Sequence, residues 1–199
     1  MEPKRCVWAD GSALERAYHD REWGVPLHDN RRLFEMLTLE GAQAGLSWRL
    51  VLSRRERYRE AFFGFDIERV AAMTDDALDA LLADPSMIRN RLKIWSVRAN
   101  ARAALEVAAT AGSLDQYLWS FLGGRPIVNR PVRRDDIPAR TELSDRMSKA
   151  LQKRGFKFVG STICYAFMQA TGMVNDHTID CFRHAELAQI HGARPAKRR

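Results

Sequence analysis

The sequence is poor in cysteine and has no long apolar run, and both absences narrow the classes of protein that it can encode. Its three cysteines, Cys6, Cys164 and Cys181, cannot all pair with one another, so they do not form the disulfide framework of a small secreted domain. The longest uncharged run, residues 158–175, is interrupted by glycines and polar side chains and is a poor membrane span. The N-terminus lacks the apolar segment of a secretory signal. We therefore expect a cytoplasmic protein with reduced thiols and no membrane partner.

Sustained alternation of apolar and polar residues, which is typical of half-buried strands, is also missing. Almost every segment instead has apolar residues at helical spacing, and Ser12, Asn30 and Ser47 stand where they can cap three of the predicted helices. We therefore predict an all-α fold. The 199 residues suffice for one compact domain or for two closely joined helical lobes. Residues 125–140 contain three prolines and no periodicity, so we expect them to form a surface connection.

Basic side chains outnumber acidic ones, with 32 Lys and Arg against 25 Asp and Glu. A surplus of this sign favours a polyanionic partner, and nucleic acid is the leading candidate. The alternative is a solvated basic face together with the basic end of the chain, "RPAKRR". Composition alone does not separate these two interpretations.

Two predicted helices in the C-terminal third are joined by a short turn. The first, "SDRMSKALQKRG", ends at Gly155, a residue type that commonly stops helices. The second begins within "FKFVGSTICYAFMQATG", after a sharp turn. Residues 145–172 are therefore a helix-hairpin-helix candidate.

A histidine and a cysteine, His177 and Cys181, are spaced to share one face of a helix and one metal ion. A closed zinc site needs four ligands, and Cys6 and His19 near the N-terminus are candidates for the other two. Four protein ligands leave no position for a catalytic water, so such a zinc ion would tie the two ends of the chain together. The alternative is that His177 and Cys181 are simply a pair of core residues.

An acidic residue, Glu40, falls on the apolar stripe that Leu33, Leu37 and Ala44 form along a predicted helix. A carboxylate in that position is either paired with an arginine inside the core or open to a cleft. Several aromatic residues surround it in the N-terminal part of the sequence, and they would suit a flat, hydrogen-bonding and cationic guest. These aromatic residues are Trp8, Tyr18, Trp23 and Trp48.

Several long motifs in this sequence are similar to those of one known family. They are "CVW", "AYHDREWGVP", "LFEMLTLEGAQAGLSW", "KRGFKFVGSTICYAFMQATGMVNDH" and "HTIDC". On these motifs, over about residues 5–182, the chain resembles 3-methyladenine DNA glycosylase I, a constitutive bacterial family of the helix-hairpin-helix glycosylase superfamily. The resemblance implies a helix-hairpin-helix glycosylase fold and a bacterial cytoplasmic protein.

The resemblance also assigns ligands and pocket residues. The structural zinc site of the family, one ion per chain, maps onto Cys6, His19, His177 and Cys181. Its base pocket maps onto Glu40, which accepts hydrogen bonds from the excised adenine, with Tyr18 contacting the base and Trp48 stacking on it. Trp8 is expected to form a further wall of this pocket.

The same resemblance implies contacts with DNA. Gly45 and Leu46 match the loop that enters the base stack and fills the gap left by the flipped nucleotide. The hairpin, residues 156–163, is expected to hold phosphates through backbone N–H groups. Phe158 departs from the superfamily pattern, in which glycine is common at that position, whereas the second glycine, Gly160, is present. The DNA-contacting residues expected in the hairpin are Lys157, Phe158, Gly160, Ser161 and Thr162.

The implied reaction is the hydrolytic excision of 3-methyladenine from alkylated double-stranded DNA, which leaves an abasic site. An enzyme that acts on a base must first flip it out of the duplex. Methylation at N3 makes the purine cationic and weakens its glycosidic bond, so the main task is selection, and we expect Glu40 to read the base. No lysine suggests itself as a Schiff-base nucleophile, so we predict a monofunctional hydrolase without lyase activity. Asp176 is interpreted as a structural group and not as the base that activates water.

Two other functions remain as alternatives. A non-catalytic DNA-binding module would use the same hairpin and basic surface, and a zinc-dependent hydrolase of small molecules is disfavoured because four ligands saturate the metal. We expect residues 1–182 to form a single glycosylase domain and residues 183–199 to form a flexible basic tail that contacts phosphates without specificity. A monomer suits an enzyme that scans a duplex.

Overall fold

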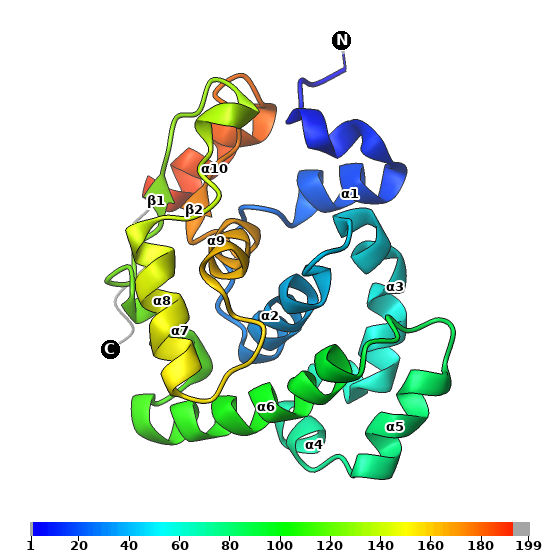
Figure 1. The fold of residues 1–199 in the computed structure, drawn as a ribbon. Helices are drawn as coiled ribbons and strands as arrows, with labels where there is room; N and C mark the ends of the chain where they lie inside the picture. Colours follow the sequence, from blue (N-terminus) through cyan, green and yellow to red (C-terminus); the bar gives the residue numbers. More distant parts are fainter. Residues whose placement is uncertain (1, 193–199) are drawn as a thin grey trace.

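The computed structural model of the chain describes residues 2–192, and this part is mostly helical, as predicted. Figure 1 shows the helices grouped around a central pair, α2 and α9. The elements are the 3-10 helix η1 (Val7–Gly11), α1 (Ala13–Arg21), α2 (Asn30–Gln43), α3 (Trp48–Ala61), η2 (Phe63–Phe65), α4 (Ile67–Ala71), α5 (Asp75–Ala83), α6 (Arg91–Ala111), α7 (Leu114–Ser120), β1 (Ile127–Val128), η3 (Arg134–Asp136), α8 (Glu142–Lys153), α9 (Ser161–Ala170), β2 (Val174–Asn175) and α10 (Phe182–Gly192).

The predicted caps are correct at two of the three helix starts. Ser12 and Ser47 accept hydrogen bonds from backbone N–H groups in the first turns of α1 and α3, as short hydroxyl side chains commonly do at this position. The prediction for α2 is wrong by one residue. Asp29 caps this helix by accepting the N–H of Arg32 at 2.8 Å, and Asn30 is its first helical residue.

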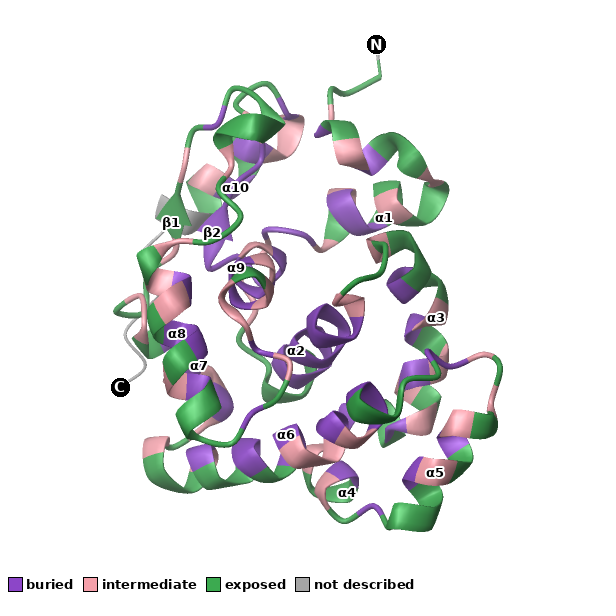
Figure 2. Ribbon diagram, viewed as in Figure 1, coloured by how far each residue is buried: buried purple, intermediate pink, exposed green. Residues whose placement is uncertain are grey.

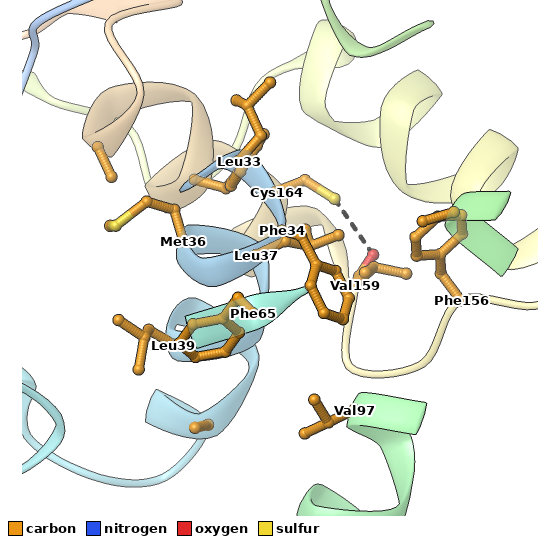
Figure 3. Packing of buried hydrophobic residues seen from close by; sticks show 14 of the residues in the cluster. Leu33, Phe34, Met36, Leu37, Leu39, Phe65, Val97, Phe156, Val159 and Cys164 are labelled. Carbon is orange, nitrogen blue, oxygen red and sulfur yellow. Dashed lines mark hydrogen bonds between the residues drawn. The ribbon is translucent and has the colours of Figure 1, made fainter. Parts of the chain in front are cut away.

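Helix α2 is buried on every side, not only along the predicted stripe. The ten consecutive residues 33–42 are all buried, which Figure 2 shows as a continuous purple helix at the centre of the molecule. Leu33, Phe34 and Leu37 pack with Val159 and Cys164 of the hairpin region (Figure 3). The position of Glu40 in this helix therefore places its side chain inside the molecule.

Helices α8 and α9 are joined by a tight turn, at the place where the sequence suggested a helix-hairpin-helix. Gly155 follows the end of α8 with φ of 89°, a left-handed conformation that glycine adopts without strain. Phe158 also has a positive φ, 53°, at the position where glycine is expected in related hairpins. A Cβ atom on Gly41 of α2 would lie only 3.1 Å from the Cβ of Phe158, so the missing side chain of Gly41 makes room for this turn.

The segment 125–140 is mostly exposed, as predicted, but it is not structureless. Within residues 2–192 the two strands run parallel, with Ile127 opposite Val174 and Val128 opposite Asn175. The backbone N–H of Ile179 also donates to the carbonyl of Pro131 at 2.9 Å. The segment is therefore fixed to residues 173–179. The all-α prediction did not include this pairing of two short strands.

The expectation of a flexible tail from residue 183 is wrong for residues 183–192. These residues belong to α10, in which Leu187 is fully buried and His184 Nε2 donates a 2.8 Å hydrogen bond to the carbonyl oxygen of Asn129. An apolar side chain that reaches the core is enough to dock the helix. The remainder of the expected tail, residues 193–199, lies outside the described residues. No helix among residues 2–192 is long and apolar enough to span a bilayer.

Candidate functional site: an aromatic cavity with a buried carboxyl group

A cavity of about 530 Å³ opens between the N-terminal helices and α9. Its size is in the range of sites for small organic ligands. Four aromatic side chains and one buried carboxyl group line it together with polar residues. The lining residues are Trp8, Gly11, Glu15, Tyr18, Trp23, Glu40, Gln43, Trp48, Arg49, Arg134, Ile137, Ala166 and Gln169.

The carboxyl group of Glu40 is the buried acidic group of this cavity. The residue is only 4% exposed, and within residues 2–192 its side chain has no hydrogen bond and no ion pair. Burial raises the pKa of Glu40 to about 8, because the ionised form loses its hydration without gaining a partner. The arginine-paired alternative is therefore wrong for Glu40, and its carboxyl group is available to a ligand.

A different glutamate in the same helix has the arginine partners. Glu35 Oε1 accepts hydrogen bonds from Arg55 and Arg59, each at 2.7 Å. Arg55 is itself buried and also binds Glu22 at 2.8 and 2.9 Å. Helix α2 thus carries two buried acids with opposite environments, one in an ionic network and one facing the cavity.

Tyr18 and Trp48 face each other at one side of the cavity, with ring centroids 5.2 Å apart. The hydroxyl of Tyr18 and the indole N–H of Trp48 are both buried without a hydrogen-bond partner in the described part of the chain. Unpaired buried polar groups are costly, and they are commonly found where a ligand completes the hydrogen bonds. Trp8 lies beside Tyr18, with 6.3 Å between ring centroids, and also lines the cavity.

Four buried side chains from the two ends of the described chain meet behind this cavity. The potential ligand atoms of Cys6, His19, His177 and Cys181 lie within 4.8 Å of one another. The sulfur of Cys181 is 3.4 Å from His19 Nε2 and 3.4 Å from His177 Nδ1, and Cys6 is 3.5 Å from the same His177 nitrogen. These separations match the edges of a tetrahedron around zinc, roughly 3.4–3.8 Å for ordinary bond lengths.

The outer nitrogens of both imidazoles are held in a way that suits metal binding. His19 Nδ1 is 2.8 Å from Asp20 Oδ1, and Asp20 is bound in turn by Arg5 at 2.9–3.0 Å. His177 Nε2 is 3.1 Å from the carbonyl oxygen of Trp23. Each partner accepts a hydrogen bond, which leaves the opposite ring nitrogen unprotonated and directed at the cluster. The four residues can therefore hold a metal ion.

One geometric premise behind this cluster is wrong. His177 and Cys181 do not share a helix, because residues 176–181 form a turn between β2 and α10. The N–H of Cys181 donates to the carbonyl of Thr178 at 2.8 Å within this turn. The Cys6 thiol and the two imidazoles lower the pKa of Cys181, which favours the thiolate form that binds metal.

The loop between α2 and α3 contains Gly45 and Leu46, which the sequence suggested as the segment that enters the DNA stack. Gly45 has φ of 74°, and Leu46 is exposed. The buried Lys93 of α6 holds the base of this loop by donating to the carbonyl oxygens of Ala42 at 2.8 Å and Ala44 at 2.5 Å. A lysine thus satisfies the carbonyl groups at the C-terminal end of α2.

The turn between α8 and α9 is held from α6 as well. Asn100, seven residues after Lys93 on the same helix, is buried and bonds to the backbone of Lys157. Gly160 precedes α9, and no side chain caps this helix, so the backbone N–H groups around Ser161 and Thr162 are open to an acceptor. Lys93 and Asn100 were not identified from the sequence, because each contact joins segments about 50 positions apart.

A sequence profile described as "Methyladenine glycosylase" matches residues 8–184 of this chain. The chain is 49% identical to DNA-3-methyladenine glycosylase 1 of Escherichia coli (strain K12) over 178 residues, which are 89% of this chain and 95% of that protein. A crystal structure of 3-methyladenine DNA glycosylase I is 51% identical, with a TM-score of 0.88 over 90% of this chain and 98% of that chain. The chain belongs to the methyladenine glycosylase family.

A member of the family from Staphylococcus aureus, solved to explain 3-methyladenine recognition, is 34% identical, with a TM-score of 0.87 over 89% of this chain and 95% of that chain. The family profile, residues 8–184, includes α2, α9 and three members of the Cys and His cluster, His19, His177 and Cys181, whereas Cys6 lies just outside it. The family assignment therefore covers the cavity as well as the surrounding helices.

Asp176, which the sequence suggested as a structural group, is buried in a hydrogen-bond network. Its carboxylate accepts from Asn129, Tyr165 and Gln169, each at 2.7 Å. The Gln169 side chain also lines the cavity. Because its Nε2 donates to Asp176, the NH₂ end of this amide is directed at Asp176. Two cavity residues, Gln169 and Arg134, were not found from the sequence, since nothing local distinguishes them from other surface residues.

Proposed function

We propose that this chain is a DNA repair glycosylase that flips 3-methyladenine out of alkylated double-stranded DNA and excises it by hydrolysis, leaving an abasic site. The observation that carries the proposal is the buried, unpaired carboxyl group of Glu40 in a cavity walled by Trp8, Tyr18 and Trp48. The related enzymes described above are named as 3-methyladenine DNA glycosylases, and one was studied for its recognition of 3-methyladenine.

Selection of the damaged base follows from the properties of this cavity. A purine methylated at N3 in DNA is cationic and electron-poor, whereas adenine is neutral. The aromatic faces of Trp48 and Tyr18 attract a cation, and Glu40 becomes ionised when such a base enters because the positive charge offsets the lost hydration of the carboxylate. Glu40 then accepts hydrogen bonds from the base edge, while the free hydroxyl of Tyr18 and the N–H of Trp48 complete the contacts.

The chemistry required of the protein is modest, because the cationic base is already a good leaving group. Glu40 binds and orients the base, and a water molecule attacks the sugar carbon that the base leaves. Asp176 is not suited to activate this water, since three hydrogen-bond donors already occupy its carboxylate. Among residues 2–192 no lysine lines the cavity, and this supports a monofunctional enzyme without lyase activity.

We further propose that Cys6, His19, His177 and Cys181 bind one structural zinc ion. Four protein ligands would leave no open position on it, so zinc would stabilise the fold without acting on the substrate. His19 follows Tyr18 directly in the chain, and the ring centroids of Trp8 and His19 are 5.3 Å apart. The metal site would therefore also fix Tyr18 and Trp8, two walls of the cavity.

The DNA contacts are proposed on the same basis. The helix-hairpin-helix of α8 and α9 would bind backbone phosphates through residues 157–162, and Gly45 and Leu46 would fill the gap left by the flipped nucleotide. The two lobes of the glycosylase domain would meet along α2 and α9, in a monomeric cytoplasmic enzyme.

Release of free 3-methyladenine from methylated duplex DNA tests the proposal. The Glu40→Gln variant should lower kcat/KM for 3-methyladenine about 10- to 100-fold, because a charged hydrogen bond is replaced by a neutral one. The matched control is Glu35→Gln, which changes a buried acid in the same helix outside the cavity and should leave base selection unchanged in the folded fraction. Duplex binding without base release would favour the DNA-binding module instead.

A further inference from the structure

The segment 125–140 carries five exposed arginines: Arg125, Arg130, Arg133, Arg134 and Arg140. Two of them have weak acidic partners, since Arg133 lies 3.9 Å from Asp136 and Arg140 lies 3.5 Å from Asp145. Arg125, Arg130 and Arg134 have no ion pair within residues 2–192. The segment therefore presents positive charge that the protein itself does not neutralise.

Arg134 differs from the other four because it lines the cavity that holds Glu40. The nearby acid Asp136 is already occupied: its carboxylate accepts the backbone N–H groups of Val132 at 2.9 Å and Arg133 at 2.8 Å. The second arginine of the cavity, Arg49, is neutralised by Glu15 at 3.0 Å. Arg134 is thus the cavity arginine that remains free for an anionic ligand in the described part of the chain.

The backbone that carries Arg134 is fixed in place. The N–H of Ile127 donates to Met173 at 2.9 Å, the N–H of Asn129 donates to Asn175 at 3.1 Å, and the Asn129 side chain binds Asp176 at 2.7 Å. Pro131 is buried and accepts from Ile179. A charge on an anchored backbone loses less conformational freedom when it binds than one on a mobile loop.

A flipped nucleotide places its base in the cavity while its phosphates stay at the opening. We infer that Arg134 binds a backbone phosphate next to the flipped nucleotide, so that the segment 125–140 contacts DNA through this one arginine, in addition to the contacts proposed for the α8–α9 hairpin and for Gly45 and Leu46. The inference rests on the proposed function, because it takes the cavity to be the site of the flipped base. Guanidinium groups are well suited to this contact, since they bind phosphate through two parallel hydrogen bonds.

The test compares Arg134→Gln with Arg125→Gln, a matched change at an unpaired arginine of the same segment that does not line the cavity. Binding to a duplex with a stable abasic analogue is measured over a range of salt concentrations. Arg134→Gln should weaken binding roughly fivefold to tenfold at low salt and reduce the slope of log K against log salt by about one. Arg125→Gln should change neither quantity by a comparable amount, and Arg134→Lys should restore the slope.

Binding of free 3-methyladenine, followed by tryptophan fluorescence, separates a phosphate contact from a contact with the base. The inference expects Arg134→Gln to bind the free base as tightly as the parent protein. Equal behaviour of the two glutamine variants on DNA would overturn it, as would a loss of free-base affinity in Arg134→Gln. Absence of base release by the parent protein would instead reject the proposed function, whatever the two variants show.

Discussion

The side chain of Asn100 bonds to both backbone groups of Lys157. Its Nδ2 donates to the carbonyl oxygen at 3.0 Å, and its Oδ1 accepts the N–H at 2.7 Å. Asn100 lies on α6 and Lys157 in the turn before α9, so one amide fixes the hairpin to the longest helix of the molecule. Lys93 on the same helix holds the loop of Gly45 and Leu46, so α6 sets the spacing between this loop and the hairpin, which are two of the proposed DNA contacts.

Replacing Asn100 with alanine should loosen the hairpin. The change leaves a backbone N–H and a carbonyl group without their partner, which destabilises a protein by about 1–3 kcal/mol for each buried group. We expect a lower melting temperature and weaker duplex binding, measured by thermal unfolding and by fluorescence anisotropy. Free 3-methyladenine should bind as before, because Asn100 is not among the cavity residues. A variant with unchanged duplex affinity would show that the hairpin does not depend on this clamp.

Glu40 should make the stability of the free protein depend on pH. Its pKa is raised from 4.5 to about 8, so between these values the folded protein keeps a proton that the unfolded chain has released. The stabilisation is fully present below the lower value and is lost as pH rises through the higher one, with a slope of at most about 1.4 kcal/mol per pH unit. Urea denaturation between about pH 5 and pH 8 should show this decline in the parent protein and not in Glu40→Gln.

The Glu35→Gln variant provides the control for this measurement. Glu35 pairs with Arg55 and Arg59, and its replacement removes one of the two carboxylates that bind the buried guanidinium of Arg55. Leaving a buried charge wholly unpaired destabilises a protein by roughly 3–5 kcal/mol, and the loss should be smaller here because Glu22 still binds Arg55. We expect a loss of stability throughout this pH range, with the Glu40-dependent decline retained.

Loss of the metal ligands should affect both stability and the cavity. The parent protein should contain one zinc ion per chain by elemental analysis, and Cys181→Ser should contain much less and melt at a lower temperature. Chelator should destabilise the parent protein and have little further effect on the variant. Because Tyr18 and Trp8 are next to His19, free-base binding should weaken in parallel. Full zinc content in Cys181→Ser would contradict the proposed ligand set.

The sequence predicted those features that depend on residue type and local spacing. Helical periodicity, the caps Ser12 and Ser47, and the membership of Glu40 in an apolar helix all follow from neighbours within a few positions. The pairing of Cys6 and His19 with the distant His177 and Cys181 came chiefly from the resemblance to a family. The two-residue strands were missed because alternation cannot be recognised over so short a length.

The contacts of Lys93, Asn100 and Arg134 could not be predicted, for a common physical reason. Each of these side chains acts on a segment far away in the sequence, and its own surroundings resemble an ordinary helix or loop. Glu35 and Glu40 illustrate the same limit, because periodicity brings both acids into α2 while only the fold decides that arginines reach Glu35 and none reaches Glu40.

Cys6 and His177 lie 171 positions apart, yet they contact each other behind the aromatic cavity. During synthesis the first half of this cluster leaves the ribosome long before the second half has been translated. The walls formed by Trp8 and Tyr18 therefore lack their support until nearly the whole chain is made. A chain that stops before His177 and Cys181 lacks half of this cluster, so under the proposed function it cannot complete the cavity that receives the base.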